Sequence, residues 1–196
     1  MMMRFILSVF LMVALNVPAL AQQAQPTQTQ APAPTTRTPI TPQIAQTYYQ
    51  QCLMAPSNPP LSASTRDIFC QCTAMFVQKN ISYEEMGLAN QTTPAGHAVQ
   101  QKILLQVYAP CMEFPVRELI QGECSANQAL AAQPHICPCV SKNMAKYTAQ
   151  SAQQNLGALM KAGQPLGDPM NALLDSPAYQ KAQQDIAMKC MTGAIN

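Results

Sequence analysis

From about residue 42 onward, apolar positions recur at the spacing of α-helices. Thr41 and Pro42 form a typical helix start, an N-cap hydroxyl followed by a proline in the first helical position. Ile44, Tyr48 and Cys52 then follow at intervals of four residues, which places them on one helical face. The pattern predicts a first helix that begins at residue 42 and carries Cys52 near its end.

A second helix is predicted from Ser62 or Ser64 to about Asn80, after a proline-rich loop over residues 55–61. Its apolar side chains fall into two stripes, and a helix that is apolar on two sides is expected to be sandwiched between neighbours. The stripes are Ile68, Cys72, Met75 and Phe76 on one side, and Cys70, Ala74, Val77 and Ile81 on the other.

Two more helix starts follow. Ser82 with Glu85 three residues later forms a capping box and predicts a short third helix. Thr93 and Pro94 open a fourth helix, which Pro110 is expected to kink or end.

The rest of the chain repeats this plan. Helices are predicted over residues 115–122, from about His135, over 151–161, and from 177 to 191 after a cap at Ser176. No stretch shows the period-two alternation of a β-strand. The predicted class is all-α.

The cysteines follow the same pattern twice. Each half of the chain has one cysteine, then a Cys-x-Cys pair, then one cysteine. Repetition at a fixed period indicates a duplicated module. We therefore predict two tandem homologous helical bundles, residues 42–112 and 113–196, stapled by disulfides. The disulfide cysteines are Cys52, Cys70, Cys72 and Cys111 in the first half, and Cys124, Cys137, Cys139 and Cys190 in the second.

Helical geometry restricts how these cysteines pair. Residues two apart on a helix point in nearly opposite directions, so a bond within Cys-x-Cys is disfavoured. Of the 105 pairings of eight cysteines, four survive if each half pairs internally. Each half is left with a sequential scheme, Cys52–Cys70 with Cys72–Cys111, or a crossed one, Cys52–Cys72 with Cys70–Cys111.

The amino-terminal residues predict a secreted protein. Arg4 precedes an apolar stretch, and Ala19-Leu20-Ala21 is typical of a signal-peptidase site, so residues 1–21 are predicted to be a signal peptide. Residues 22–41 are rich in Gln, Thr, Ala and Pro, a composition typical of a disordered linker. We expect a periplasmic or secreted chain without a transmembrane segment after signal cleavage.

Charge and composition limit the classes of molecule that are expected to bind this chain. Without Arg4 the chain has ten basic and nine acidic residues and no basic cluster, which argues against nucleic acid as a partner. Tryptophan is absent, so aromatic binding contacts are expected only at the tyrosines, which are Tyr48, Tyr49, Tyr83, Tyr108, Tyr147 and Tyr179. The acidic residues Glu113, Glu118 and Glu123 are expected to be solvated.

No catalytic signature is found. The two histidines, His97 and His135, belong to no hydrolase, metalloprotease or c-type haem motif. No catalytic residue, metal ligand or cofactor is therefore assigned. The predicted function is a non-enzymatic structural or interaction module that holds an unknown protein partner in the cell envelope, in the groove between the halves or on a helix face.

A soft-metal protein is the alternative. Reduced cysteines, together with methionines such as Met112 and Met191, offer sulfur ligands that suit Cu(I). Thiols in a secreted protein are usually oxidised, and methionine at helical spacing commonly fills a core. Whether the cysteines are oxidised to disulfides or reduced to thiols therefore discriminates between an interaction module and a soft-metal protein.

Overall fold

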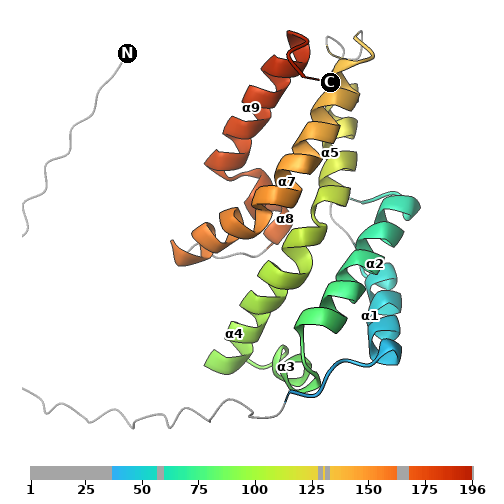
Figure 1. The fold of residues 1–196 in the computed structure, drawn as a ribbon, viewed down its shortest axis with the longest axis vertical. Helices are drawn as coiled ribbons and strands as arrows, with labels where there is room; N and C mark the ends of the chain where they lie inside the picture. Colours follow the sequence, from blue (N-terminus) through green and yellow to red (C-terminus); the bar gives the residue numbers. More distant parts are fainter. Residues whose placement is uncertain (1–36, 57–59, 128–129, 131–132, 163–167, 196) are drawn as a thin grey trace, which may run out of the picture. The chain divides into compact units, whose positions relative to one another are not determined.

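The computed structural model describes residues 37–56, 60–127, 130, 133–162 and 168–195. The predicted signal peptide and residues 22–36 of the predicted linker lie outside these residues. The helical elements are α1 (Pro42–Met54), α2 (Ala63–Asn80), α3 (Tyr83–Leu88), α4 (Pro94–Ile103), a π-helical segment η1 (Leu104–Tyr108), a 3₁₀ segment η2 (Ala109–Cys111), α5 (Glu113–Ala126), α7 (Ile136–Lys161), α8 (Pro169–Leu174) and α9 (Pro177–Met191) (Figure 1). Within the described ranges there is no β-strand, so the all-α class is confirmed.

The predicted helix starts are confirmed by their caps. Each capping hydroxyl accepts the backbone N–H three residues on, at 3.1 to 3.4 Å. These caps are Thr41, Ser62, Ser82, Thr93 and Ser176. Ser82 and Glu85 complete the predicted capping box. The local sequence therefore determines where most of these helices begin.

Two helices are longer than predicted. The expected break before Ser151 is wrong, because one helix, α7, runs from Ile136 to Lys161. The Ser151 hydroxyl donates to the Tyr147 carbonyl at 2.8 Å instead of capping a new helix. Helix α5 begins at Glu113 rather than at Pro115, since a proline is tolerated in the first helical turn, where N–H groups lack helical partners anyway.

Helix α2 buries one of its two apolar stripes. Cys70, Ala74 and Val77 are buried, whereas Ile68 and Met75 are 46% and 59% exposed. The stripe that contains Ile68 and Met75 is therefore covered only in part, through Cys72, which bonds to Cys111, and through Phe76, which packs against buried residues such as Val77.

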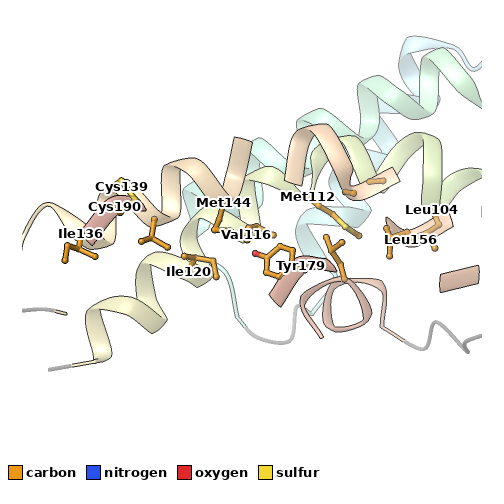
Figure 2. Close-up of a cluster of buried hydrophobic side chains, with 14 residues drawn as sticks. Leu104, Met112, Val116, Ile120, Ile136, Cys139, Met144, Leu156, Tyr179 and Cys190 are labelled. Carbon is orange, nitrogen blue, oxygen red and sulfur yellow. A yellow bond between two sulfur atoms is a disulfide. The ribbon is translucent and has the colours of Figure 1, made fainter. Parts of the chain in front are cut away.

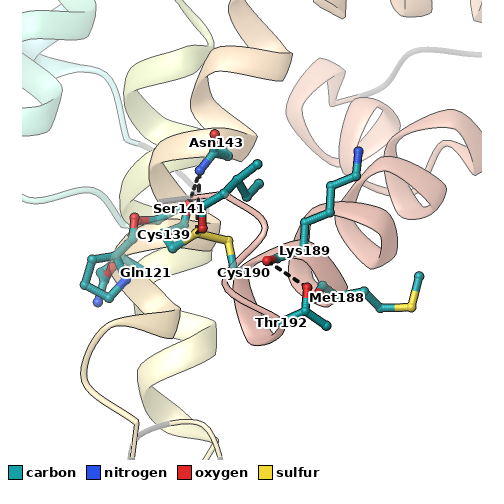
Figure 3. The surroundings of a disulfide bond; sticks show 10 residues. Gln121, Cys139, Ser141, Asn143, Met188, Lys189, Cys190 and Thr192 are labelled. Atoms are coloured by element: carbon teal, nitrogen blue, oxygen red, sulfur yellow. Dashed lines mark hydrogen bonds between the residues drawn. A yellow bond between two sulfur atoms is a disulfide. The ribbon is translucent and has the colours of Figure 1, made fainter.

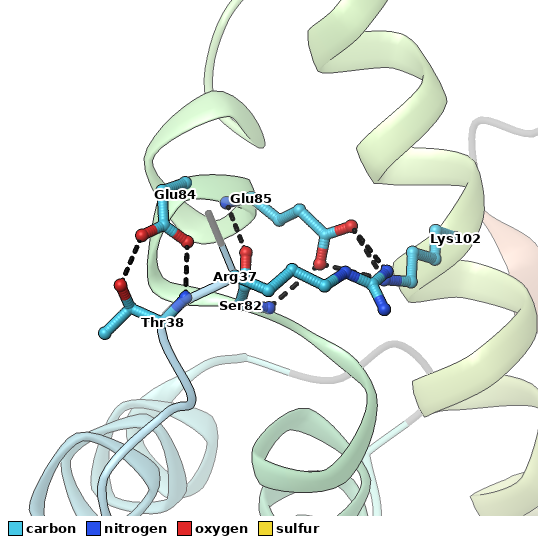
Figure 4. Close-up of polar contacts among 6 residues, drawn as sticks. All are labelled: Arg37, Thr38, Ser82, Glu84, Glu85 and Lys102. Carbon is cyan, nitrogen blue, oxygen red and sulfur yellow. Dashed lines mark hydrogen bonds and ion pairs between the residues drawn. The ribbon is translucent and has the colours of Figure 1, made fainter. Parts of the chain in front are cut away.

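Residues 37–40, which were assigned to the linker, belong to the fold. The Thr38 backbone N–H and hydroxyl both donate to the Glu84 carboxylate, and Arg37 pairs with Glu85 at 3.4 Å (Figure 4). Ile40 is buried in the core beside α2. We call residues 37–40 the N-terminal clasp, because they tie the start of α1 to α3.

The chain passes from α4 to α5 through the irregular segments η1 and η2. Pro110 has no N–H to donate to the Gln106 carbonyl, and its ring crowds that carbonyl. The Asn80 side-chain amide donates to the Gln106 carbonyl instead, at 3.0 Å. The backbone remains helical through Met112, so Pro110 changes the type of helix. The predicted boundary between residues 112 and 113 falls inside this run, and the two-bundle organisation stays a prediction.

Two apolar cores support these helices. The larger one combines Leu104 and Met112 with Ile136, Met144 and Tyr179, and so draws on both predicted halves (Figure 2). The smaller one lies between the clasp, α1, α2 and η1 and includes Ile40, Val77 and Val107.

Candidate binding groove

All eight cysteines are paired in the structure, and the pairing is sequential in both halves. The bonds are Cys52–Cys70, Cys72–Cys111, Cys124–Cys137 and Cys139–Cys190, with Cα atoms 5.5 to 5.9 Å apart. Each Cys-x-Cys pair thus ties its helix to the preceding helix through its first cysteine and to a following element through its second.

The surroundings of Cys139–Cys190 show how one of these bonds is held (Figure 3). Asn143, one turn along α7, donates to the Cys139 carbonyl at 2.9 Å, and Ser141 donates to Gln121 on α5 at 3.0 Å. The bond itself fixes the end of α9 to the start of α7. Three helices are therefore tied together around the Cys-Pro-Cys segment.

The paired sulfurs bear on the soft-metal alternative. That alternative requires thiolates, and none of the eight cysteines is free. Nor does the described part of the chain bring three His, Cys, Asp or Glu side chains together as a metal site.

Tyr108, at the end of η1, is the centre of an aromatic cluster. The Tyr48 hydroxyl donates to the Tyr108 hydroxyl at 3.0 Å, and the Phe69 ring centroid lies 6.1 Å from that of Tyr108. Burial raises the pKa of Tyr48 well above its usual value. The cluster joins α1, α2 and η1. Tyr48 and Tyr108 were among the tyrosines predicted as candidate contacts.

Three hollows adjoin at Tyr108. The first, of about 390 Å³, lies between α1 and α2; the second, of about 430 Å³, lies between α2 and α5; the third, of about 530 Å³, lies along α4. We call the three together the Tyr108 groove. Its side chains include Tyr48, Leu61, Arg66 and Phe69 at one end, Met112, Leu119 and Pro169 in the middle, and His97, Leu104 and Met160 at the other end.

The groove separates its charged side chains. Arg66 lines the α1–α2 hollow, and its Nη1 donates to the Leu53 carbonyl at 3.4 Å. Asp168 lines the middle hollow, where its carboxylate accepts the Met170 and Asn171 N–H groups as the N-cap of α8. The hollow along α4 contains His97. These three groups thus line different parts of the groove.

A hydrogen bond between distant segments supports the groove wall. The Ser62 N–H and hydroxyl both donate to the Glu118 carboxylate at 2.6 Å. Although burial acts in the opposite direction, the hydrogen bonds from Ser62 lower the pKa of Glu118. Glu118 is therefore partly exposed to solvent, and it also connects α5 to the start of α2.

Sequence reasoning missed Arg66 and Phe69 as groove residues. The sequence does contain a signal for Phe69. Phe69 directly precedes Cys70, and Tyr48 lies one helical turn before Cys52, the disulfide partner of Cys70. The Cys52–Cys70 bond brings Tyr48 and Phe69 to the same hollow. His135, the other histidine, is exposed at the start of α7.

In the described part of the chain, no helix has the length and apolar character that a membrane span requires. Comparison with protein-family models, with curated proteins and with solved structures finds no match to this chain. The groove and the disulfides are therefore the features from which a function can be inferred.

Proposed function

We propose that this chain is a non-enzymatic interaction module of an oxidising compartment, periplasmic or secreted, that holds a partner in the Tyr108 groove. Four disulfides in an all-helical domain are typical of proteins outside the reducing cytosol. In this proposal residues 1–21 are the signal peptide and residues 22–36 are a linker.

The proposal also treats the two halves as homologous units. The order of the α-helices is the same in both halves: two longer helices, then a short one, then a longer one. In the first half these helices are α1, α2, α3 and α4, and in the second half they are α5, α7, α8 and α9. In both sets the second helix contains the Cys-x-Cys pair, and the first cysteine of the pair bonds to the end of the first helix. The second cysteine bonds to η2, which follows α4, in the first set and to the end of α9 in the second. Duplication explains this agreement in order and connectivity.

The observation that carries the function is that the groove takes its lining residues from both of the proposed units. Leu61, Phe69 and Tyr108 come from the first unit, and Pro115 and Leu119 from the second. Ligand sites are preferentially concave, largely apolar and located between structural units. The separation of its charged groups favours binding over catalysis.

Photo-crosslinking from the groove tests the function. A benzoylphenylalanine in place of Leu119, in the full chain in its native compartment, is expected to capture a partner on irradiation, because Leu119 lines the groove. The measurement is the mass of the adduct, which identifies a protein or a small molecule. The same residue in place of Arg117, exposed on the same helix, is the matched control. Equal capture at both positions, or none at Leu119, contradicts the proposed function.

A further inference from the structure

We propose that the Tyr108 groove binds a free fatty acid, with its carboxylate at Arg66 and its acyl chain against Phe69 and Tyr108. The inference rests on the proposed function, because it names the molecule that the groove holds. It follows from the size of the groove, its lining and the position of its charges.

The size and the lining favour one flexible apolar chain. The hollows of about 390 and 430 Å³ share Leu61, Phe69 and Tyr108, so that they adjoin, and each lies in the range of small-molecule sites. Met112 and Leu119 continue the apolar surface away from Arg66. An acyl chain that lies against these side chains removes part of its apolar surface from water, and each methylene group that becomes fully buried is favourable by about 0.8 kcal/mol.

The charges give the ligand a direction. Arg66 supplies a positive charge at the α1–α2 end, and no acidic side chain lines that hollow among the described residues. Asp168 lines the middle hollow and repels a carboxylate there, whereas it does not repel an uncharged chain. A guanidinium binds a carboxylate through charge-assisted hydrogen bonds. The head group therefore lies at Arg66, and the chain runs toward Met112 and Leu119.

The test compares decanoate with 1-decanol by isothermal titration calorimetry of the full chain with intact disulfides. We expect decanoate to bind about tenfold or more tightly, since a hydrogen bond to a charged group discriminates by at least that factor. Arg66→Gln is expected to bring the ratio of the two affinities close to one while decanol still binds. Arg117→Gln, which removes an exposed arginine outside the groove, is expected to leave the ratio unchanged.

Two further measurements do not depend on the folding of Arg66→Gln. Below the pKa of decanoic acid the wild-type preference is expected to disappear, because the ligand is then uncharged. Leu119→Trp is expected to weaken binding of both ligands by filling the groove. Equal affinity of the wild type for both ligands at neutral pH, or no binding of decanoate, overturns the inference. Crosslinking of a protein at Leu119 without decanoate binding also overturns it, and leaves the proposed function standing.

Discussion

Gly96, in the first turn of α4, lies directly against the turn that follows α3. A methyl group at this position would lie 2.1 Å from the Gln91 carbonyl oxygen and 2.8 Å from that of Leu88. Both are backbone atoms, which do not move aside as a flexible side chain does. The approach of α3 to α4 therefore depends on the absence of a side chain at Gly96.

Gly96→Ala is accordingly expected to destabilise the protein by roughly 1 to 3 kcal/mol, the usual cost of overpacking. Gly122→Ala on α5 is the matched control, because its methyl group meets no atom within 4 Å. There alanine is expected to be neutral or to stabilise by about 0.5 to 1 kcal/mol through its higher helix propensity. Thermal melting of the two variants measures the difference, and equal melting temperatures would show that the α3–α4 turn adjusts freely.

The N-terminal clasp is held by hydrogen bonds and ion pairs to the carboxylates of Glu84 and Glu85, so its stability depends on pH. The hydrogen bond from the Thr38 hydroxyl, together with N–H groups, lowers the pKa of Glu84 from 4.5 to about 2. For Glu85, burial acts against the change, but the Lys102 ammonium at 2.7 Å and the Ser82 N–H lower its pKa as well. A carboxylate whose pKa is lowered by folding stabilises the folded form above its unfolded pKa, and this contribution is lost as the pH falls through the folded pKa.

We expect the clasp to open as the pH falls from about 5 to about 2. The reporter is the Tyr83 amide, which donates to the Thr38 carbonyl at 2.9 Å, and the measurement is its hydrogen-exchange protection factor. Glu84→Gln is expected to lower this protection already at neutral pH and to flatten its pH dependence. Asp185→Asn on α9 controls for the loss of one exposed negative charge. Full protection of Tyr83 at pH 2 would contradict the role of the carboxylates, and the Ile81 amide, which donates to the Val77 carbonyl at the C-cap of α2, serves as an internal reference.

The elements also show how far sequence reasoning extends. Helix starts were predictable because a capping hydroxyl and a following proline act within one turn of chain. The false break at Ser151 arose because a serine that bonds the carbonyl four residues back looks in sequence like a cap. The Glu118–Ser62 contact spans 56 residues, and no local pattern reports a contact of that separation. The groove was likewise beyond prediction in detail, since its walls come from α1, α2, α4 and α5.

Each disulfide is expected to stabilise the folded protein more, the longer the loop of chain that it closes. In the chain-entropy model, Cys139–Cys190, with a separation of 51 residues, stabilises by roughly 4 kcal/mol, and Cys124–Cys137, with a separation of 13, by roughly 3 kcal/mol. Replacing the first pair by alanine is therefore expected to lower the melting temperature more than replacing the second. Reduction of all four bonds is expected to unfold the protein or to lower its melting temperature by well over about 10 °C.

Alkylation under denaturing conditions provides the control for both measurements. The wild type should show no modified cysteine without reductant, since all eight are paired. An unchanged melting temperature in excess reductant would show that the bonds do not support the fold.

The sequential pairing has a consequence for how the chain matures. Counted along the chain, the first cysteine bonds to the second, the third to the fourth, the fifth to the sixth and the seventh to the eighth. No disulfide loop therefore overlaps or encloses another. If the chain enters an oxidising compartment amino end first, each cysteine meets its correct partner as the next thiol to emerge. A simple thiol oxidase that joins successive cysteines would then produce the native pattern without help from an isomerase, because no wrong bond has to be undone.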